Sequence, residues 1–242
     1  MDAQLFYEEK QFRKRLLIAG CDPGISVLLR HLQREGIEAV AAYRNSSQSL
    51  DLLKHSFIHI AGSHLRDEAT GESNLPAVRK QFPKGSVAVI SYAIWQEGMV
   101  VARGNPKNIK DVSDLARKDV AIVNREKGAG SRFLLDSHLK KAGIPPQKVN
   151  GYKEITAGHL PAAWQVRCGH ADCCLATKTS ASVFGLDFIP LQSERYDLVI
   201  RRENLTHPSI QVLLETLGRT AFRRELEGLG GYDTRNAGDR LI

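Results

Sequence analysis

The sequence predicts an α/β fold in which mainly parallel strands alternate with helices. The chain has 242 residues, enough for one large domain or for two lobes of roughly 100 residues each with separate cores. Short apolar runs alternate with stretches whose apolar residues recur at helical spacing, and glycine, proline and asparagine separate them. Because strand–helix–strand units place successive strands in parallel, this alternation indicates a sheet covered by helices on both faces.

The composition excludes several classes of protein. Hydrophobic residues make up 42% and charged residues 25%, so the chain is not disordered, collagen-like or a disulfide-stapled miniprotein. It holds no run of about 18 apolar residues that could span a membrane. The first residues lack the order of a secretory signal, and the four cysteines show no disulfide spacing, so we expect a cytoplasmic protein. A chain whose signal peptide had been removed before residue 1 would show the same features.

The first part of the chain reaches residue 98 and begins with a polar lead over residues 1–15. Asp22 and Pro23 are expected to start the first helix, as its carboxylate N-cap and its first helical residue. Residues 66–85 are polar and rich in glycine and proline, which predicts a surface excursion. The expected strands are 15–19, 37–43 and 57–61, with helices over 25–36 and 47–53 between them.

The rest of the chain continues the pattern with weaker regularity. The expected strands are 87–90, 98–102, 120–123, 171–175, 188–191 and 196–200. The expected helices are 111–115, 133–143, 156–168, 210–217 and 222–229. A loop over residues 124–131 follows one of these strands directly.

Several short motifs carry a resemblance to a known family. They are Gly104-Asn-Pro106, Asp114-Leu115, Val120-Ala-Ile-Val-Asn-Arg125, Gly128-x-Gly-Ser-Arg132, Leu134-Leu-Asp136, Gly62-x-His64, Gly169-x-Ala171-Asp172 and Gly230-Gly-Tyr-Asp233. Their order and spacing, from about residue 16 to 238, resemble type II periplasmic-binding-protein folds. More narrowly, the chain is similar to the PBP-like domain family associated with molybdate- or tungstate-responsive regulators and with molybdopterin biosynthesis proteins.

The resemblance implies a fold and a function. It implies two α/β lobes joined by two crossover strands, near residues 99–103 and 191–196, with the ligand between the lobes. Lobe one would then comprise residues 16–98 plus 193–242, and lobe two residues 99–192. It further implies a non-enzymatic sensor domain that closes on molybdate or tungstate and signals by lobe closure to a separate DNA-binding or molybdenum-cofactor partner.

The net charge of +7 lies almost entirely in one segment. Residues 99–192 carry fourteen basic and eight acidic side chains, whereas residues 16–98 and 193–242 are each balanced. This distribution favours steering of a small anion to the predicted cleft, and it also fits an acidic partner on the outer face of that lobe. Without a block of like charges or a DNA-binding motif, direct nucleic-acid binding and membrane binding are not expected. The sequence leaves undecided whether the protein forms a homodimer.

The candidate ligand-binding residues gather at strand-to-helix turns. In a parallel sheet these turns meet at the carboxyl ends of the strands, where helix N-termini and hydroxyl groups can surround an anion. The turn residues are Asp22, Ser26, Ser46, Ser47, Ser63, His64, Gly128, Gly130, Ser131 and Thr156. A tetrahedral oxyanion needs many such donors aimed at one point.

The run from Gly128 to Arg132 is the sharpest of these candidates. Its glycines can fold the backbone into a nest of N–H groups, although an ordinary loop with Ser131 as helix N-cap explains the same residues. It lacks the Walker pattern, so nucleotide hydrolysis is not expected. Arg125 and Arg132 can pair with the anion or form ion pairs of the protein itself.

Four of the candidate side chains each allow two interpretations. Asp22 would repel an anion unless it caps a helix or binds an arginine across the cleft. His64 can donate to the ligand or be a buried, hydrogen-bonded histidine, and His159 can contact the ligand or pack against the cleft wall. Tyr196 lies at the second predicted crossing, where its hydroxyl could reach the ligand or be half-buried between the lobes.

Neither a metal centre nor a catalytic site is predicted. The spacing of Cys168, Cys173 and Cys174 fits no zinc pattern, and adjacent cysteines in a strand point to opposite faces, so we interpret them as small apolar residues. Hydrolase and metalloprotease motifs are absent from the sequence. No cofactor is expected besides the oxyanion ligand.

Two alternative functions remain. One is an effector domain like that of a LysR-type transcription regulator, which would bind a small organic acid. The other is an accessory protein of molybdenum-cofactor biosynthesis, which would bind a pterin phosphate.

Overall fold

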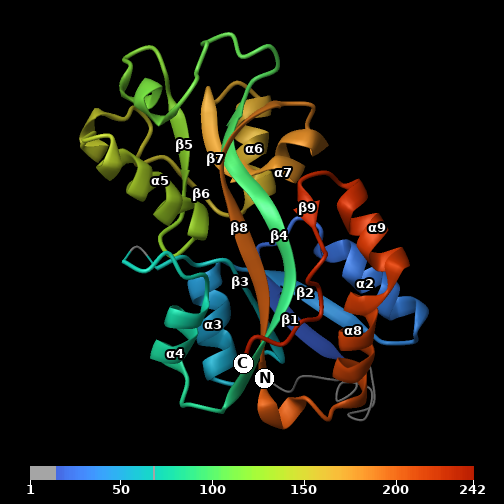
Figure 1. Ribbon diagram of the computed structural model, residues 1–242. Coiled ribbons are helices and arrows are strands. Elements are labelled where there is room, and N and C mark those ends of the chain that lie inside the picture. The colour runs from blue at the N-terminus through green and yellow to red at the C-terminus, as the bar shows by residue number, and fades with distance from the viewer. Residues whose placement is uncertain (1–14, 68) are drawn as a thin grey trace, which may run out of the picture.

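One curved sheet of nine strands runs the whole length of the molecule in the computed structural model, which describes residues 15–67 and 69–242 (Figure 1). Two long strands, β4 (Val87–Val101) and β8 (Asp187–Arg201), pass through both halves and pair antiparallel along their length. The α/β class, the flanking helices and the two crossover strands are therefore confirmed. Over the described ranges, none of the helices combines the length and apolar character needed to cross a bilayer.

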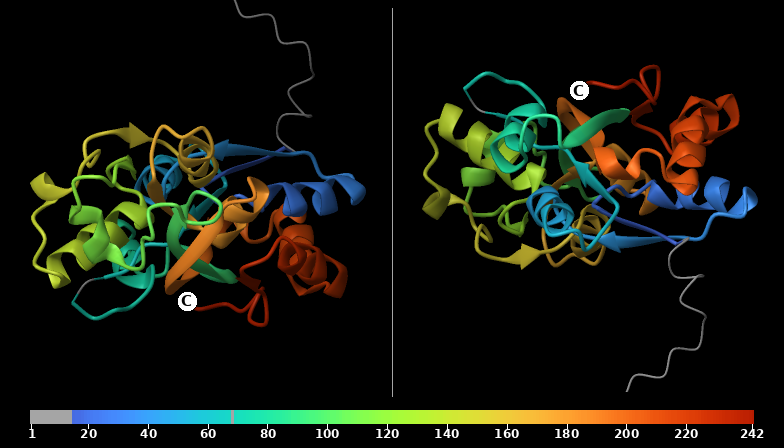
Figure 2. Two further views of the ribbon diagram at one scale, coloured as in Figure 1. Left: turned by 90° about the horizontal axis from the view of Figure 1, so that it is seen from above. Right: turned by 90° about the horizontal axis from the view of Figure 1, so that it is seen from below.

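Lobe one is the half that contains the first three strands. These are β1 (Leu16–Gly20), β2 (Ala39–Tyr43) and β3 (Ile60–Ser63), in the sheet order β2-β1-β3-β8-β4. Its helices are α2 (Ile25–Arg34), α3 (Ser46–Lys54), α4 (Leu75–Gln81), α8 (Pro208–Gly218) and α9 (Thr220–Gly228). Helices α3 and α4 cover one face and α2, α8 and α9 the other, as the end-on views show (Figure 2). The strand β9 (Tyr232–Asp233) pairs with β4.

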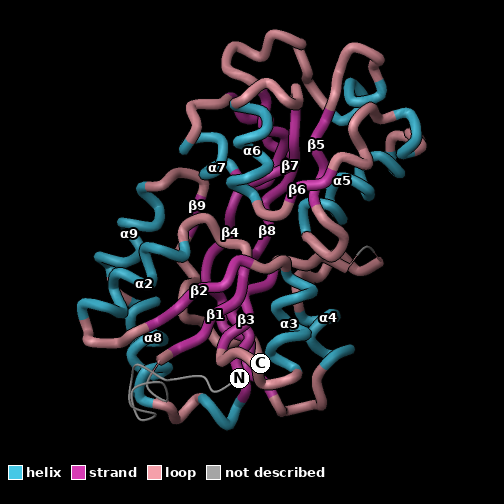
Figure 3. The backbone as a smooth tube through the Cα atoms, turned by 180° about the vertical axis from the view of Figure 1, so that it is seen from behind, coloured by secondary structure: helices cyan, strands magenta, loops and turns pink. Residues whose placement is uncertain are grey.

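Lobe two is the half that contains the middle of the chain (Figure 3). Its strands are β5 (Ile122–Arg125), β6 (Ile155–Thr156) and β7 (Cys173–Thr177), which continue the sheet in the order β4-β7-β5-β6. Its helices are α5 (Gly130–Lys141), α6 (His159–Arg167) and α7 (Lys178–Val183), with short 3-10 turns at Val112–Ala116 and Pro146–Lys148. A third 3-10 turn, Arg202–Asn204, follows β8.

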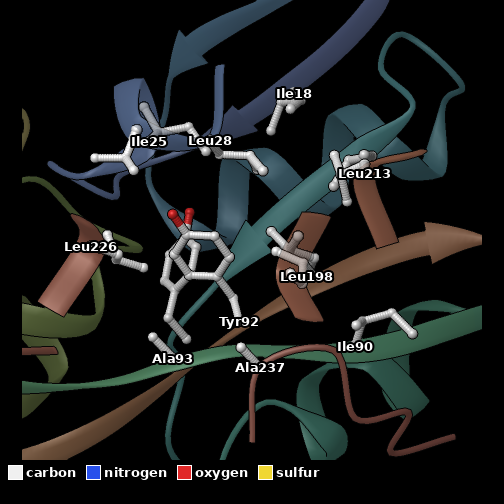
Figure 4. Packing of buried hydrophobic residues seen from close by; sticks show 14 of the residues in the cluster. Ile18, Ile25, Leu28, Ile90, Tyr92, Ala93, Leu198, Leu213, Leu226 and Ala237 are labelled. Atoms are coloured by element: carbon white, nitrogen blue, oxygen red, sulfur yellow. The ribbon is translucent and has the colours of Figure 1, made fainter. Parts of the chain in front are cut away.

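The apolar cores lie between these helices and the two faces of the sheet. In lobe one the larger core joins α2, α8 and α9 to the sheet, and Figure 4 shows Tyr92 of β4 among Ile25, Leu28, Leu198 and Leu226. In lobe two the core under α5 is separate from the core under α6 and α7. Each lobe thus has its own pair of cores, one on each face of the sheet.

The two adjacent cysteines of β7 behave as the sequence predicted. Cys173 packs in the core on the α5 side and Cys174 in the core on the α6 side, because successive side chains of a strand alternate between faces. Both are free thiols, fully buried and small enough for these tightly packed positions. Cys168 is exposed at the end of α6, which differs from the expected apolar role.

Several boundaries differ from those expected. The two strands expected over residues 87–102 are one strand, β4, because its polar middle residues also pair with β8, with register shifts at Ser91/Ala93 and Glu97/Gly98. The segment of β4 that passes between the lobes is 92–96, between the pairs Ser91–Asp197 and Glu97–Thr177, so the first crossing precedes the predicted residues 99–103. The polar excursion of residues 66–85 contains the helix α4.

The predicted Asp22 cap is wrong, and Ser131 does not occupy the N-cap position that was one of its two possible roles. Helix α2 begins at Ile25 with Gly24 as its N-cap, and Asp22 instead accepts a hydrogen bond from the Gly24 main-chain N–H at 2.9 Å. Helix α5 begins at Gly130 after the N-cap Ala129, which puts Ser131 inside the first turn with its hydroxyl turned to another partner.

Replacing Gly62 by alanine is expected to destabilise lobe one. A Cβ atom on Gly62 would lie 1.8 Å from the hydroxyl oxygen of Tyr196, so the tyrosine must move within a filled core. Overpacking of this kind costs about 1–3 kcal/mol, measurable as a lower urea midpoint. Gly228→Ala is the matched control because a Cβ there meets no atom within 4 Å, and it should leave stability unchanged or raise it. Equal midpoints for the two variants would contradict this packing.

Candidate functional site: the cavity between the lobes

A cavity of about 530 Å³ lies between the two lobes and is called the interlobe cavity below. Lobe one contributes the end of β1, the end of β2 and the start of α3, while lobe two contributes the end of β5 and the start of α6. The lining residues are Cys21, Pro23, Tyr43, Arg44, Asn45, Gln48, Arg125, Glu126, Ala157, Gly158, His159, Leu160 and Pro161. The cavity therefore sits at carboxyl ends of parallel strands, where open α/β sheets place their ligands.

The start of α6 offers the cavity unsatisfied main-chain donors. Gly158 is the N-cap and has a positive φ of 92°, and no side chain caps the helix. The first N–H groups of a helix have no acceptor within it and carry part of the positive end of the helix dipole. Since Gly158, His159 and Leu160 all line the cavity, these donors favour an anion there.

Arg125 supplies a buried positive charge at the same place. It is the last residue of β5, is 1% exposed and lines the interlobe cavity. Its guanidinium pairs with the Glu126 carboxylate, with 3.0 Å between Nε and Oε2, and Nη1 donates to the Ser131 hydroxyl at 3.4 Å. Arg44 of lobe one also lines the cavity, so the lining contains two guanidinium groups, of Arg44 and Arg125, and the Glu126 carboxylate.

Asn45 ties the two lobes together beside the cavity. Its side chain caps α3 by accepting from the Gln48 N–H at 3.0 Å, while its amide nitrogen donates to the Lys127 carbonyl of lobe two at 3.3 Å. The Ser47 N–H donates to the Gly128 carbonyl at 3.4 Å. The loop of residues 127–128 is thus hydrogen-bonded to the start of α3 and brings the lobes together.

A fully buried carboxylate, Glu97 of β4, lies next to the interlobe cavity. The Ser131 hydroxyl donates to its Oε1, and its Oε2 is 3.4 Å from Nδ1 of His64. The Nδ1 atom of His159 lies 4.0 Å from Oε1. Glu97 is 0% exposed and each histidine is 1% exposed, so one carboxylate and two imidazoles share a buried site between the lobes.

These groups shift one another's ionisation. Burial opposes the charge of Glu97, but His64 above all, together with His159 and Ser131, lowers its pKa to about 2. Burial alone would lower the pKa of His64, but Cys21 and Glu97 raise it well above its usual value. Burial and the charge of Arg125 hold the pKa of His159 well below its usual value. The cluster therefore favours the ionised form of Glu97, the protonated form of His64 and the neutral form of His159.

Aromatic rings enclose this buried site. Trp95 of β4 is 1% exposed, and its ring centroid lies 4.6 Å from that of Tyr196 and 4.9 Å from that of His64. The ring of His159 is 5.5 Å from Trp95 and 5.4 Å from His64. Both lobes and both crossover strands meet at this ring cluster, so a change at the cavity reaches Trp95 directly.

The structure brings about half of the sequence-predicted site residues to the cavity or its buried border. Arg125 and His159 line the cavity, and His64 and Ser131 lie beside Glu97. The Ser46 hydroxyl accepts from the His64 main-chain N–H at 3.0 Å. Two glycines complete this group: Gly130 lies directly beneath His64, and Gly128 has a positive φ of 92° and packs on Ser47.

The other predicted residues are turned to different partners. The Asp22 carboxylate accepts from the Tyr232 hydroxyl, so it points away from the cavity, and Tyr196 is buried against Gly20 and Gly62. The Ser63 hydroxyl donates to Asn74 at 3.0 Å. Ser26 is exposed on α2, and Thr156 is half-buried before the turn into α6. Arg132 pairs with Asp136 at 3.2 Å and covers the ring of Tyr152.

Three residues that matter here were not predicted. Cys21 follows β1 directly, so its position at the carboxyl end of a strand was a signal that pointed to the cavity. Glu97 interrupts the apolar residues of β4, and a lone carboxylate in such a run indicates a specific partner. Asn45 was not predicted as a site residue, although the two serines that follow it were.

Glu194 of β8 is a second buried carboxylate, and replacing it is expected to change the stability of the protein in a pH-dependent way. Burial, with Glu97 nearby, raises its pKa from the usual 4.5 to about 7. A carboxyl with a raised native pKa stabilises the fold while protonated, and this contribution is lost as pH rises from below 4.5 through 7. Glu194→Gln, which stays neutral, should therefore be more stable than the parent at pH 8 by up to about 3 kcal/mol and similar to it at pH 4.

Urea unfolding at the two pH values measures this difference. The control is Glu203→Gln, because Glu203 is an exposed carboxylate whose side chain is 69% accessible. It should change stability by the same small amount at both pH values. If Glu194→Gln behaves like the control, the environment described for Glu194 is wrong.

Comparison with known proteins places this architecture in a family. A family model described as a PBP superfamily domain matches residues 29–218. The chain is also similar to the protein YvgK of Bacillus subtilis (strain 168), with 35% identity over 235 residues, which cover 97% of this chain and 76% of that one.

Solved structures agree with the fold. The sulfate-binding protein SubI of Mycobacterium tuberculosis H37Rv aligns with a TM-score of 0.67 and 12% identity, covering 90% of this chain and 86% of SubI. A protein from Clostridium perfringens solved with bound phosphate aligns with a TM-score of 0.65 and 11% identity, covering 90% of this chain and 98% of that one. The chain belongs to the PBP-like family of PBP superfamily domains.

Proposed function

We propose that the chain is a non-enzymatic ligand-binding domain that captures a small oxyanion, molybdate or tungstate, in the interlobe cavity. The observation that carries the proposal is the meeting of the uncapped N-terminus of α6 and the buried guanidinium of Arg125 at one cavity. Main-chain N–H groups together with one buried cation form a site that selects a negative ligand.

The charge distribution supports the same ligand class. The basic excess lies in residues 99–192, which include both Arg125 and the start of α6. The Asp22 carboxylate, which would repel an anion, is held by Gly24 and Tyr232 outside the cavity lining. Solved proteins of the same fold include one that binds sulfate and one with bound phosphate.

Lobe closure is the signal in this proposal. The cavity lining comes from both lobes, so a ligand that fills the cavity would favour the closed arrangement and shift the population towards it. Asn45 and Ser47 of lobe one would then hold the loop at residues 127–128 of lobe two. A separate regulator or a molybdenum-cofactor protein would detect the closed form.

A small organic acid is the second candidate ligand, and the size of the cavity favours it. The volume of about 530 Å³ exceeds what one tetrahedral oxyanion fills, and it falls within the roughly 300–1,000 Å³ typical of organic ligand sites. Tyr43, Leu160 and Pro161 add apolar walls that an oxyanion does not use.

Isothermal titration at micromolar protein distinguishes these ligands. The panel is molybdate, tungstate, sulfate, phosphate, a set of small carboxylic acids and a pterin phosphate, in a buffer free of oxyanions. We expect one site per chain, with molybdate or tungstate tightest. Heat from a carboxylic acid alone would establish the organic-acid effector, heat from the pterin phosphate alone the cofactor-assembly function, and flat traces throughout would contradict ligand capture.

A further inference from the structure

Three potential metal ligands meet at the inner wall of the interlobe cavity. They are the thiol of Cys21 and the imidazoles of His64 and His159, and one ligand atom from each lies within 4.8 Å of the other two. All three side chains are buried. They come from three separate segments, after β1, after β3 and at the start of α6. We call this group the Cys–His–His cluster.

We propose that the Cys–His–His cluster binds a divalent transition metal ion, zinc before others. One thiolate and two neutral imidazoles are the donor set that zinc prefers, and three protein ligands leave the fourth position of a tetrahedral ion for water or a ligand. Ligand atoms around zinc lie roughly 3.5 Å apart when the bonds are 2.0–2.3 Å.

The unpartnered histidine nitrogens are the independent observation that favours a ligand. Both ring nitrogens of His64 and both of His159 are buried without a hydrogen-bond partner. Buried polar atoms are almost always paired, because an unpaired one costs about 1–3 kcal/mol. An ion bound by one nitrogen of each ring would satisfy two of these four atoms, and Nδ1 of His64 also faces Glu97 at 3.4 Å.

The surroundings of the cluster complete the site. The Oε2 atom of Glu97 lacks a hydrogen-bond partner and lies 3.4 Å from Nδ1 of His64. Metal-bound imidazoles commonly have a carboxylate at their other nitrogen, which fixes the ring orientation. Glu97 has this place beside His64, and Ser131 in turn holds Glu97.

The metal would join the two lobes. Cys21 and His64 belong to lobe one, whereas His159 is the first residue of α6 in lobe two. A bound ion would therefore hold the interlobe cavity in its closed form, with the open coordination position next to the cavity lined by Cys21 and His159. This proposal does not depend on oxyanion binding, since the metal would be held by thiol and imidazole groups, whereas the anion site uses the Arg125 guanidinium and main-chain N–H groups.

Titration of the chelator-treated full chain with Co²⁺ tests the cluster. Cobalt takes zinc sites and reports a thiolate ligand by a charge-transfer band in the near ultraviolet, along with visible bands of tetrahedral geometry. We expect one Co²⁺ per chain, full displacement by one Zn²⁺, and a higher melting temperature with Zn²⁺. No stoichiometric band, or octahedral cobalt only, would overturn the proposal.

Two ligand variants identify the residues that bind the metal. If one variant folds poorly, the other still tests the proposal. Cys21→Ser should abolish the thiolate band and weaken metal binding at least about 100-fold, and His159→Asn should weaken it similarly while keeping a weak thiolate band. Cys168→Ser is the matched control, because Cys168 is an exposed thiol at the far end of α6 and should leave the spectrum unchanged. A band that is lost in the control and kept in Cys21→Ser would also overturn the assignment.

The proposed metal site and the proposed oxyanion site can be tested independently of each other. Molybdate titrations with an excess of chelator measure the anion site alone, and cobalt titrations without oxyanions measure the cluster alone. Arg125→Ala should weaken only the former and Cys21→Ser the latter. Loss of both activities in either variant, with the fold intact by circular dichroism, would mean that the two sites are one.

Discussion

Replacing Arg125 by alanine is expected to weaken oxyanion binding about 100-fold or more. The variant removes the one buried guanidinium of the cavity lining and leaves the Glu126 carboxylate without its partner at 3.0 Å. Truncation of one member of a buried charge pair costs about 2–5 kcal/mol, and every 1.4 kcal/mol is tenfold in affinity. Calorimetric titration with the tightest-binding oxyanion measures the change.

The matched control for this variant is Arg167→Ala. Arg167 is exposed at the carboxyl end of α6, so this control removes the same charge from the same lobe without touching the cavity. Its affinity should stay within about threefold of the parent, because an exposed charge acts only through long-range steering. Equal losses in the two variants would show that net charge, rather than the Arg125 contact, governs binding.

Replacing Trp95 by alanine is expected to destabilise the protein by about 3–5 kcal/mol, the cost of truncating a buried tryptophan. Its ring is 1% exposed and packs against Tyr196, His64 and His159, where the crossover strands meet both lobes. Urea unfolding followed by circular dichroism measures the loss, and the folded fraction should fall steeply near body temperature.

Trp95→Phe separates packing from hydrogen bonding at the same position. The Nε1 atom of Trp95 is buried without a hydrogen-bond partner, so a phenyl ring loses volume but no polar contact. We expect a cost clearly below that of Trp95→Ala, because a phenyl ring leaves a smaller cavity than a methyl group does. A cost equal to that of Trp95→Ala would mean that the indole N–H has a partner that the structure does not contain.

The succession of strands and helices in lobe one could be predicted from the sequence because its signals are local. The apolar runs at β1, β2 and β3 are bounded by glycine or asparagine, and helices with regular apolar spacing separate them. Each strand or helix can therefore be recognised from a stretch of about ten residues. The parallel pairing of β1 with β2 and β3 follows from this alternation.

The crossover strands and the buried site depend on contacts that are distant in sequence. Gln96, Glu97 and Gly98 break the apolar pattern of β4, and only pairing with β8 a hundred residues later keeps the strand continuous. The burial of Glu97 depends on Ser131 and His64, which approach it from different lobes. The Cys–His–His cluster was missed for the same reason, since sequence spacing detects only ligands close together in the chain.

The fluorescence of Trp95 during a molybdate titration tests ligand capture between the lobes most directly. The chain has two tryptophans, and Trp164→Phe removes the half-exposed one, leaving Trp95 beside His159 at the cavity wall. We predict a saturable change with one site per chain that is preserved in Arg167→Ala and shifted at least about 100-fold in Arg125→Ala. An unchanged Trp95 signal while molybdate binds by calorimetry would place the ligand elsewhere and contradict the account.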